Sequence, residues 1–189
     1  MSSPIRAGAV ICAVAALLAI IVPRGDAVSV RDAPGCPGSG QMPERANVDS
    51  TRWAILCLLN RERARHGLQP LTPNPLLDLA SQRHSDDMVA RRFFEHDTPE
   101  GVPPEQRIVA AGYAGEGVWV GENIYAGAGP DATPVRAASH WMKSPGHREN
   151  ILRPQFTEVG VGISYDAPWD IGDRRGATYT TDFGGPDVR

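Results

Sequence analysis

Apolar residues recur at helical spacing in two long stretches of the first half of the chain. Residues 49–67 begin at a capping Asp49 or Ser50, are apolar on nearly all faces over residues 53–59, and stop at a glycine. This pattern predicts a helix that is buried on several sides. Residues 74–94 begin with asparagine and proline and place an apolar stripe on one face, which predicts a second helix.

Two shorter helices are predicted in the middle of the chain, over residues 103–112 and 133–143. Each begins beside a proline, which suits the first turn of a helix. The second of them has an apolar stripe that includes Trp141. We expect it to end at Ser144, because the residue before Pro145 disfavours helical geometry.

Alternating patterns come later and predict strands over residues 119–125, 159–165 and 179–183. Residues 159–165 alternate large side chains with glycines, so we expect another element to pack closely against the glycine side. A turn-rich loop over residues 169–176 joins the last two strands. Helices first and strands later indicate the α+β class, with a small, mainly antiparallel sheet covered by helices.

The length and charge of the chain narrow its class. A chain of 189 residues, less a leader, corresponds to one domain. The formal net charge is −3 and the isoelectric point is about 5.9. This balance gives no support to nucleic-acid binding.

The first 27 residues predict a secretory signal peptide, since Arg6 precedes an apolar run over residues 7–22 and small residues follow it. The alternative is an uncleaved membrane anchor. Residues 28–47 are rich in proline, glycine, serine and charge and predict a flexible linker. The folded domain is expected over residues 48–189, in a secreted, extracellular protein.

Two cysteines, Cys36 and Cys57, remain after the leader, which contains Cys12. In an exported protein such a pair favours a disulfide over a metal pair or a nucleophile. The bond would tie the linker to the first helix.

The five histidines fall into two groups. His66 ends the first helix, His84 lies on the apolar face of the second, and His140 lies within the fourth, on its surface; all three have structural interpretations. His96 and His147 instead follow helices in loops beside proline and glycine, where functional groups concentrate on a rigid scaffold.

A carboxylate, Glu122, follows a glycine in a predicted strand and could orient an imidazole. His96, Glu122 and His147 are therefore candidate residues of one polar cleft, whether catalytic or metal-binding. The sequence has no His-Glu-x-x-His or Cys-x-x-Cys motif, so two imidazoles would bind zinc together with water or a carboxylate. A serine hydrolase using Ser144, His147 and Glu122 is an alternative, although no Gly-x-Ser-x-Gly elbow is present.

Five segments in order resemble the bacterial branch of the CAP superfamily, which includes cysteine-rich secretory and plant pathogenesis-related proteins. They are ILCLLNRER at 55–63, FEHDTPEG at 94–101, GENI at 121–124, WMKSPGHRENIL at 141–152 and FTEVGVG at 156–162. The resemblance covers about residues 50–184 and places the CAP domain at 48–189.

This resemblance implies a three-layer α-β-α sandwich around a cleft lined by two histidines and two glutamates. His96 and His147 match the histidines and Glu122 matches the first glutamate. The second glutamate would fall near Ser144, where this sequence has no acid; Glu149 is a possible substitute.

The family is associated with several functions, which leaves three hypotheses. The first is a binding module for Zn²⁺ or another divalent metal through His96 and His147, supported by Glu122. The second is an extracellular hydrolase of the peptidase kind, in which metal or His147 activates water. The third is a lipid- or sterol-binding protein. The expected partner is an extracellular lipid, peptide or cell-envelope component, with membrane contact only through an uncleaved leader.

Overall fold

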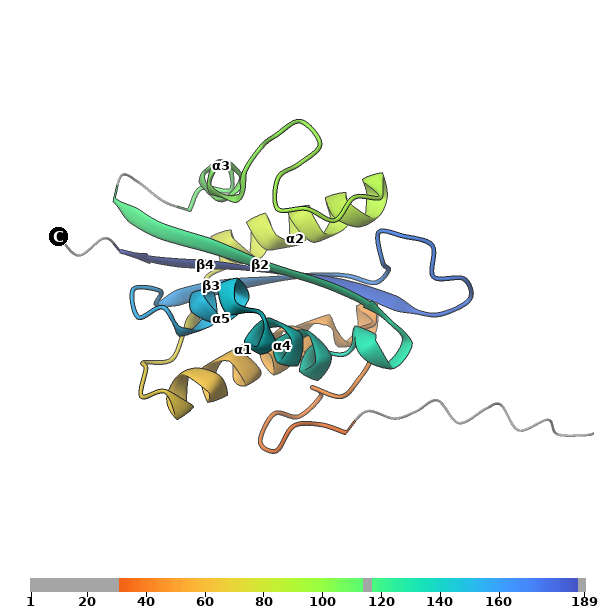
Figure 1. The fold of residues 1–189 in the computed structure, drawn as a ribbon, viewed down its shortest axis with the longest axis horizontal. Helices are drawn as coiled ribbons and strands as arrows, with labels where there is room; N and C mark the ends of the chain where they lie inside the picture. Colours follow the sequence, from red (N-terminus) through yellow and green to blue (C-terminus); the bar gives the residue numbers. More distant parts are fainter. Residues whose placement is uncertain (1–30, 114–116, 187–189) are drawn as a thin grey trace, which may run out of the picture.

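A four-stranded sheet runs through the middle of the molecule and carries helices on both faces (Figure 1). The computed structural model describes residues 31–113 and 117–186; the predicted signal peptide lies outside them. The strands lie in the order β1-β3-β4-β2, with β1 parallel to β3 and the other pairs antiparallel. Their bounds are β1 Thr72–Pro73, β2 Val118–Ala128, β3 Glu158–Ser164 and β4 Gly176–Pro186.

The helices form the outer two layers (Figure 1). One layer contains α2 (Pro75–Arg91) and α3 (Pro104–Ala110). The other contains α1 (Val48–Arg65), α4 (Pro134–Lys143) and α5 (Pro145–Leu152). The predicted α+β sandwich with a small, mainly antiparallel sheet is therefore confirmed. None of the helices in the described ranges is long and apolar enough to cross a membrane.

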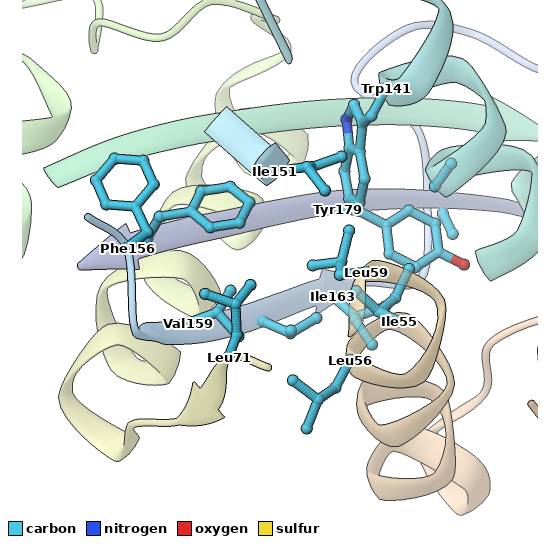
Figure 2. Packing of buried hydrophobic residues seen from close by; sticks show 14 of the residues in the cluster. Ile55, Leu56, Leu59, Leu71, Trp141, Ile151, Phe156, Val159, Ile163 and Tyr179 are labelled. Carbon is cyan, nitrogen blue, oxygen red and sulfur yellow. The ribbon is translucent and has the colours of Figure 1, made fainter. Parts of the chain in front are cut away.

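The main apolar core lies between the sheet and the layer of α1, α4 and α5 (Figure 2). Trp141 of α4 and Tyr179 of β4 are fully buried there beside Ile55 and Leu59 of α1. Phe156 stacks on Phe183, with ring centroids 5.5 Å apart, at the other end of the cluster. The all-round apolar character of residues 53–59 thus corresponds to a helix that packs on the sheet and on α4.

On the opposite face, α2 lies against the backbone of β3. A Cβ atom on Gly160 would be 2.0 Å from the carbonyl carbon of Leu77, and one on Gly162 would be 2.2 Å from that of Ser81. Only glycine leaves room for this approach. The expected close packing against the glycine side of the strand is therefore present, and α2 provides it.

The outer edge of β3 is covered by side chains of α1 and α2. The carboxylate of Asp78 accepts from the backbone N–H of Val161, and Arg52 donates to the Val161 carbonyl. The side-chain amide of Gln82 donates to the carbonyl of Ile163 and accepts from the backbone N–H of the same residue. These contacts satisfy backbone groups that an edge strand would otherwise offer to another chain.

The segment before α1 is held more firmly than the sequence suggests. The predicted disulfide between Cys36 and Cys57 is confirmed. We expected a linker fixed only at this bond. In its described part, residues 31–47, the Asp32 carboxylate also accepts two backbone N–H groups of the same segment, and the Ser39 carbonyl accepts from Val135 at the start of α4. Local hydrogen bonds therefore order this segment, although its residues bury little apolar surface.

Three local features differ from the sequence-based expectations. The apolar stripe predicted on the second helix, which would comprise Leu76, Ala80, His84 and Met88, begins instead at Leu77, because Leu76 is exposed. The short parallel strand β1 has too few residues to show an alternating pattern. The proline after Ser144 ends α4, as expected, but it also opens α5, so His147 lies in the first turn of a helix instead of a loop.

Candidate functional site

The three predicted site residues meet beside β2, which is an edge strand of the sheet. His96 comes from the loop after α2, Glu122 from β2, and His147 from the first turn of α5. The Nδ1 atom of His96 lies 2.8 Å from Oε1 of Glu122. The ring centroids of His96 and His147 are 6.2 Å apart. Side chains from both helical layers thus converge around one strand edge.

Glu122 is an almost fully buried carboxylate that is hydrogen-bonded to two basic side chains, with His84 Nε2 also 3.9 Å from its Oε1 atom. Its Oε1 atom contacts His96, and its Oε2 atom accepts a hydrogen bond of 2.8 Å from the guanidinium of Arg107. The same Arg107 nitrogen donates to the backbone carbonyl of His96. Burial raises the pKa of Glu122, but the hydrogen bond with His96 and the charge of Arg107 outweigh it, so that the net shift is downward. Arg107 therefore fixes both the acid and the loop that carries the imidazole.

The two site histidines have opposite electrostatic environments. The hydrogen bond to Glu122 raises the pKa of His96, against the effect of burial. Burial lowers the pKa of His147, and the charges of His96 and His140 lower it further. The buried Nδ1 atom of His147 has no hydrogen-bond partner in the described part of the chain. His147 is therefore the less basic member of the pair.

Two asparagines hold α5, and with it His147, against β2. Asn123 is fully buried and donates to the backbone carbonyl of His147 at 3.0 Å. Asn150 donates to the side chain of Asn123 and to the backbone carbonyl of Glu122. These hydrogen bonds connect the backbone of His147 in α5 to the backbone of Glu122 in β2.

A second carboxylate, Asp182, lies behind the site. It is directly opposite Glu122 in the β2–β4 register and is fully buried. Ser81 of α2 donates to one of its oxygens. Burial, together with the nearby charge of Glu122, raises the pKa of Asp182 well above its ordinary value. Of these two facing buried carboxylates, Asp182 therefore has the raised pKa and Glu122 the lowered one. Nearby, His84 is buried, with Nε2 at 3.0 Å from the carbonyl of Glu95, in agreement with its interpretation as a core histidine.

The donor atoms fit a metal site in which the protein supplies only some of the ligands and leaves other coordination positions free. Both oxygens of Glu122 are occupied by His96 and Arg107, which leaves the two imidazoles as ligands and the carboxylate as the group that orients one of them. A tetrahedral zinc with Zn–N bonds of about 2.0–2.1 Å places the centroids of two ligand rings about 5 Å apart. The observed separation is 6.2 Å, so the two rings would have to approach each other by about 1 Å to share one ion. Across residues 31–113 and 117–186, no group of three or more His, Cys, Asp or Glu side chains is placed to hold an ion. Other ligands would have to fill the remaining positions.

The geometry does not support the serine-hydrolase triad or the use of Glu149 as the missing acid. Glu122 orients His96, not His147, and within the described residues Ser144 makes no hydrogen bond to His147. The Ser144–His147–Glu122 triad is therefore not formed. Glu149, considered as a substitute for the missing acid, forms a surface ion pair with Arg153.

A cavity of about 340 Å³ extends from the histidine pair along β2. Its walls include Phe94, Ile124, Tyr125, Ala126 and His140. His140 is exposed, as expected, but it lines the cavity, and its ring centroid lies 5.2 Å from that of Tyr125. A third imidazole therefore belongs to the same concave surface.

Sequence reasoning missed several residues of this region, namely Arg107, Asn123, His140, Asn150 and Asp182. Asn123 and Asn150 lie inside the segments that carried the family resemblance, and their side-chain amides were a usable signal. No signal in the sequence indicated Arg107 or Asp182, because an isolated charged residue in a helix or strand is most often exposed.

Comparisons with known proteins identify relatives of this chain in sequence and in structure. Uncharacterized protein YkwD of Bacillus subtilis (strain 168) is 34% identical over 117 residues, which are 62% of this chain and 44% of that protein. An extracellular protein containing an SCP domain from Bacillus anthracis is 30% identical, with a TM-score of 0.58 over 71% of this chain and 40% of its own. This chain thus spans less than half the length of either Bacillus relative. An outer surface protein of Borrelia burgdorferi shares the fold, with a TM-score of 0.60 at 16% identity over 77% of this chain and 96% of its own.

The family model described as the cysteine-rich secretory protein family, CAP, matches residues 56–180. This range runs from α1 through the site residues into β4. The chain belongs to the CAP family.

Proposed function

We propose that this protein is an extracellular binding module whose cleft takes up a divalent metal, zinc foremost, through His96 and His147. Glu122 has a supporting role as the acceptor that orients His96. The observation that carries the proposal is the pair of imidazoles with centroids 6.2 Å apart, one of them hydrogen-bonded through Nδ1 to a buried carboxylate.

The carboxylate–imidazole contact supports the metal proposal in a specific way. When Nδ1 of His96 bonds to Glu122, the Nε2 atom is left as the available donor. Histidines that bind metals generally use this arrangement, since the second partner fixes the ring and raises its basicity. Imidazole ligands suit zinc, copper and nickel better than magnesium or calcium. When bound, such an ion would supply Lewis acidity at the cleft.

An extracellular location rests on two further observations. The disulfide between Cys36 and Cys57 suits an oxidising compartment. The Bacillus anthracis relative is described as an extracellular protein.

Zinc titration by calorimetry tests the proposal. Wild type is expected to bind one ion, and the double variant His96→Ala/His147→Ala is expected to bind none at this site. His66→Ala removes an exposed histidine at the end of α1 and serves as the matched control. Glu122→Gln is expected to weaken binding about 10- to 100-fold. Equal zinc binding by wild type and the double variant would reject the proposal.

A further inference from the structure

The cavity beside the histidine pair combines a polar end with an apolar body. His96 and His147 form the polar end, and Glu95 and His140 also line the cavity. Ile124 and Ala126 line the cavity along β2, and the aromatic rings of Phe94 and Tyr125 form part of its walls. A volume of about 340 Å³ falls at the lower end of the range for small-molecule sites. The shape therefore suits one small ligand with two chemically different ends.

The charges around the polar end favour an anion. The negative charge of Glu122 is already balanced by Arg107, in an ion pair that is almost entirely buried. A divalent ion bound by His96 and His147 would therefore carry positive charge that the Glu122–Arg107 pair does not neutralise. Glu95 and Asp97 are nearby acids, but both are exposed and screened by solvent. A carboxylate on the ligand would supply the missing charge and an oxygen donor.

The walls of the cavity favour an aromatic ring. Phe94 is held in an edge-to-face contact by Trp169, with ring centroids 5.7 Å apart. Tyr125 is fixed between His140 and Tyr179, at 5.2 and 6.3 Å, and its hydroxyl donates to the backbone carbonyl of Asp131. Side chains held in this way offer a preformed surface, which reduces the entropy lost when a flat ligand binds.

We propose that this cavity binds a small aromatic carboxylate, with the carboxylate at the His96–His147 end and the ring between Phe94 and Tyr125. The inference rests on the proposed metal site, because the carboxylate is placed at the metal-bearing end. The same chemistry is presented by a free aromatic acid and by a peptide that ends in an aromatic residue.

Calorimetry on the zinc-loaded protein tests this inference, after zinc binding itself has been measured. The probes are 3-phenylpropionate for the free acid and N-acetylphenylalanine for the peptide end. Acetate lacks the ring, and 3-phenylpropionamide lacks the charge. At least one aromatic acid is expected to bind at least tenfold more tightly than acetate and than the amide. Removal of zinc is expected to weaken that binding by a similar factor.

Two variants locate the ligand. Phe94→Ala removes a wall, and Ala126→Leu fills the cavity at a half-exposed position where added volume does not crowd the core. Each is expected to weaken the aromatic acid about tenfold while zinc affinity stays unchanged. Trp53→Ala removes an exposed aromatic side chain that lines a different groove, and is expected to change neither.

The two levels of the proposal fail differently. Absence of zinc binding would overturn the proposed function. Zinc binding without binding of either aromatic acid would overturn this inference alone. So would binding that is unaffected by both Phe94→Ala and Ala126→Leu, or binding that is equal for acid and amide.

Discussion

The two faces of the sheet bury different kinds of side chain. Towards α1, α4 and α5, the strands present large apolar groups such as Tyr179 and Phe183. Towards α2, they present glycines on β3 and the buried polar groups Thr180 and Asp182 on β4, which are hydrogen-bonded to serines of α2. The same central strand thus supports an apolar core on one side and a polar layer on the other.

The apolar groups mainly stabilise the fold, whereas the buried polar groups also set the positions of individual side chains. Apolar burial is strong but has little directional preference, whereas buried hydrogen bonds and ion pairs fix particular atoms. Glu122 lies at the polar side, and its orientation depends on Arg107 and His96. We therefore expect changes in the apolar core to alter stability, and changes in the buried polar groups around β2, including Asn123 and Asn150 on the α5 side, to alter the site as well.

The largest effect is expected from Trp141→Ala on the apolar face. Trp141 is fully buried, and its indole N–H donates to the carbonyl of Ile124. Loss of this side chain is expected to lower the free energy of unfolding by about 4 kcal/mol. Urea denaturation measures it, with the exposed Trp53→Ala as a control that should change stability by less than about 0.5 kcal/mol. Similar losses for both variants would contradict the assignment of the core.

A smaller loss, about 3 kcal/mol, is expected from Arg107→Gln on the polar face, since it leaves the buried carboxylate of Glu122 without its ion pair. The double variant Arg107→Gln/Glu122→Gln should recover part of this loss, because no buried charge is then left unpaired. A double-variant cycle in urea measures the coupling. Simple addition of the two single losses would show that the pair is not coupled.

The raised pKa of Asp182 can be tested through the pH dependence of stability. The carboxyl group of Asp182 ionises near pH 4 in the unfolded chain and at a higher pH in the folded chain. The free energy of unfolding of wild type should therefore fall, relative to Asp182→Asn, by up to about 1.4 kcal/mol per pH unit as the pH rises above about 4. A difference that is flat between pH 4 and 7 would show that Asp182 is ionised in the fold.

The smallest effects concern the histidines themselves. NMR titration should show His96 with a pKa above its ordinary value and His147 with one below it. Glu122→Gln should lower the pKa of His96, because the acceptor of its hydrogen bond loses its charge. A pKa of His96 that is unchanged in the variant would mean that the two side chains are not in contact in solution.

The sequence predicted most of the apolar face and little of the polar one. The apolar run at residues 53–59 and the glycine alternation at residues 159–165 depend on local periodicity, and the structure confirms both. His96, Glu122 and His147 could be selected because they lie in segments that resemble a known family. Their convergence beside β2 required the fold.

The rest of the site depends on pairings between distant residues. Arg107 and Glu122 come from a short helix and a strand, and nothing in either local sequence indicates that the two charges are buried together. The register that sets Asp182 opposite Glu122 is likewise invisible in a single strand. His140 has the exposure of a surface residue and belongs to the cavity only because Tyr125 lies beside it.

The most direct test of the metal site is anomalous diffraction at the zinc absorption edge, from crystals of the protein grown with zinc. The account predicts an anomalous peak within bonding distance of His96 and His147, with Glu122 still hydrogen-bonded to His96. Crystals that contain zinc only at other positions, or whose cleft shows no anomalous peak at saturating zinc, would contradict it.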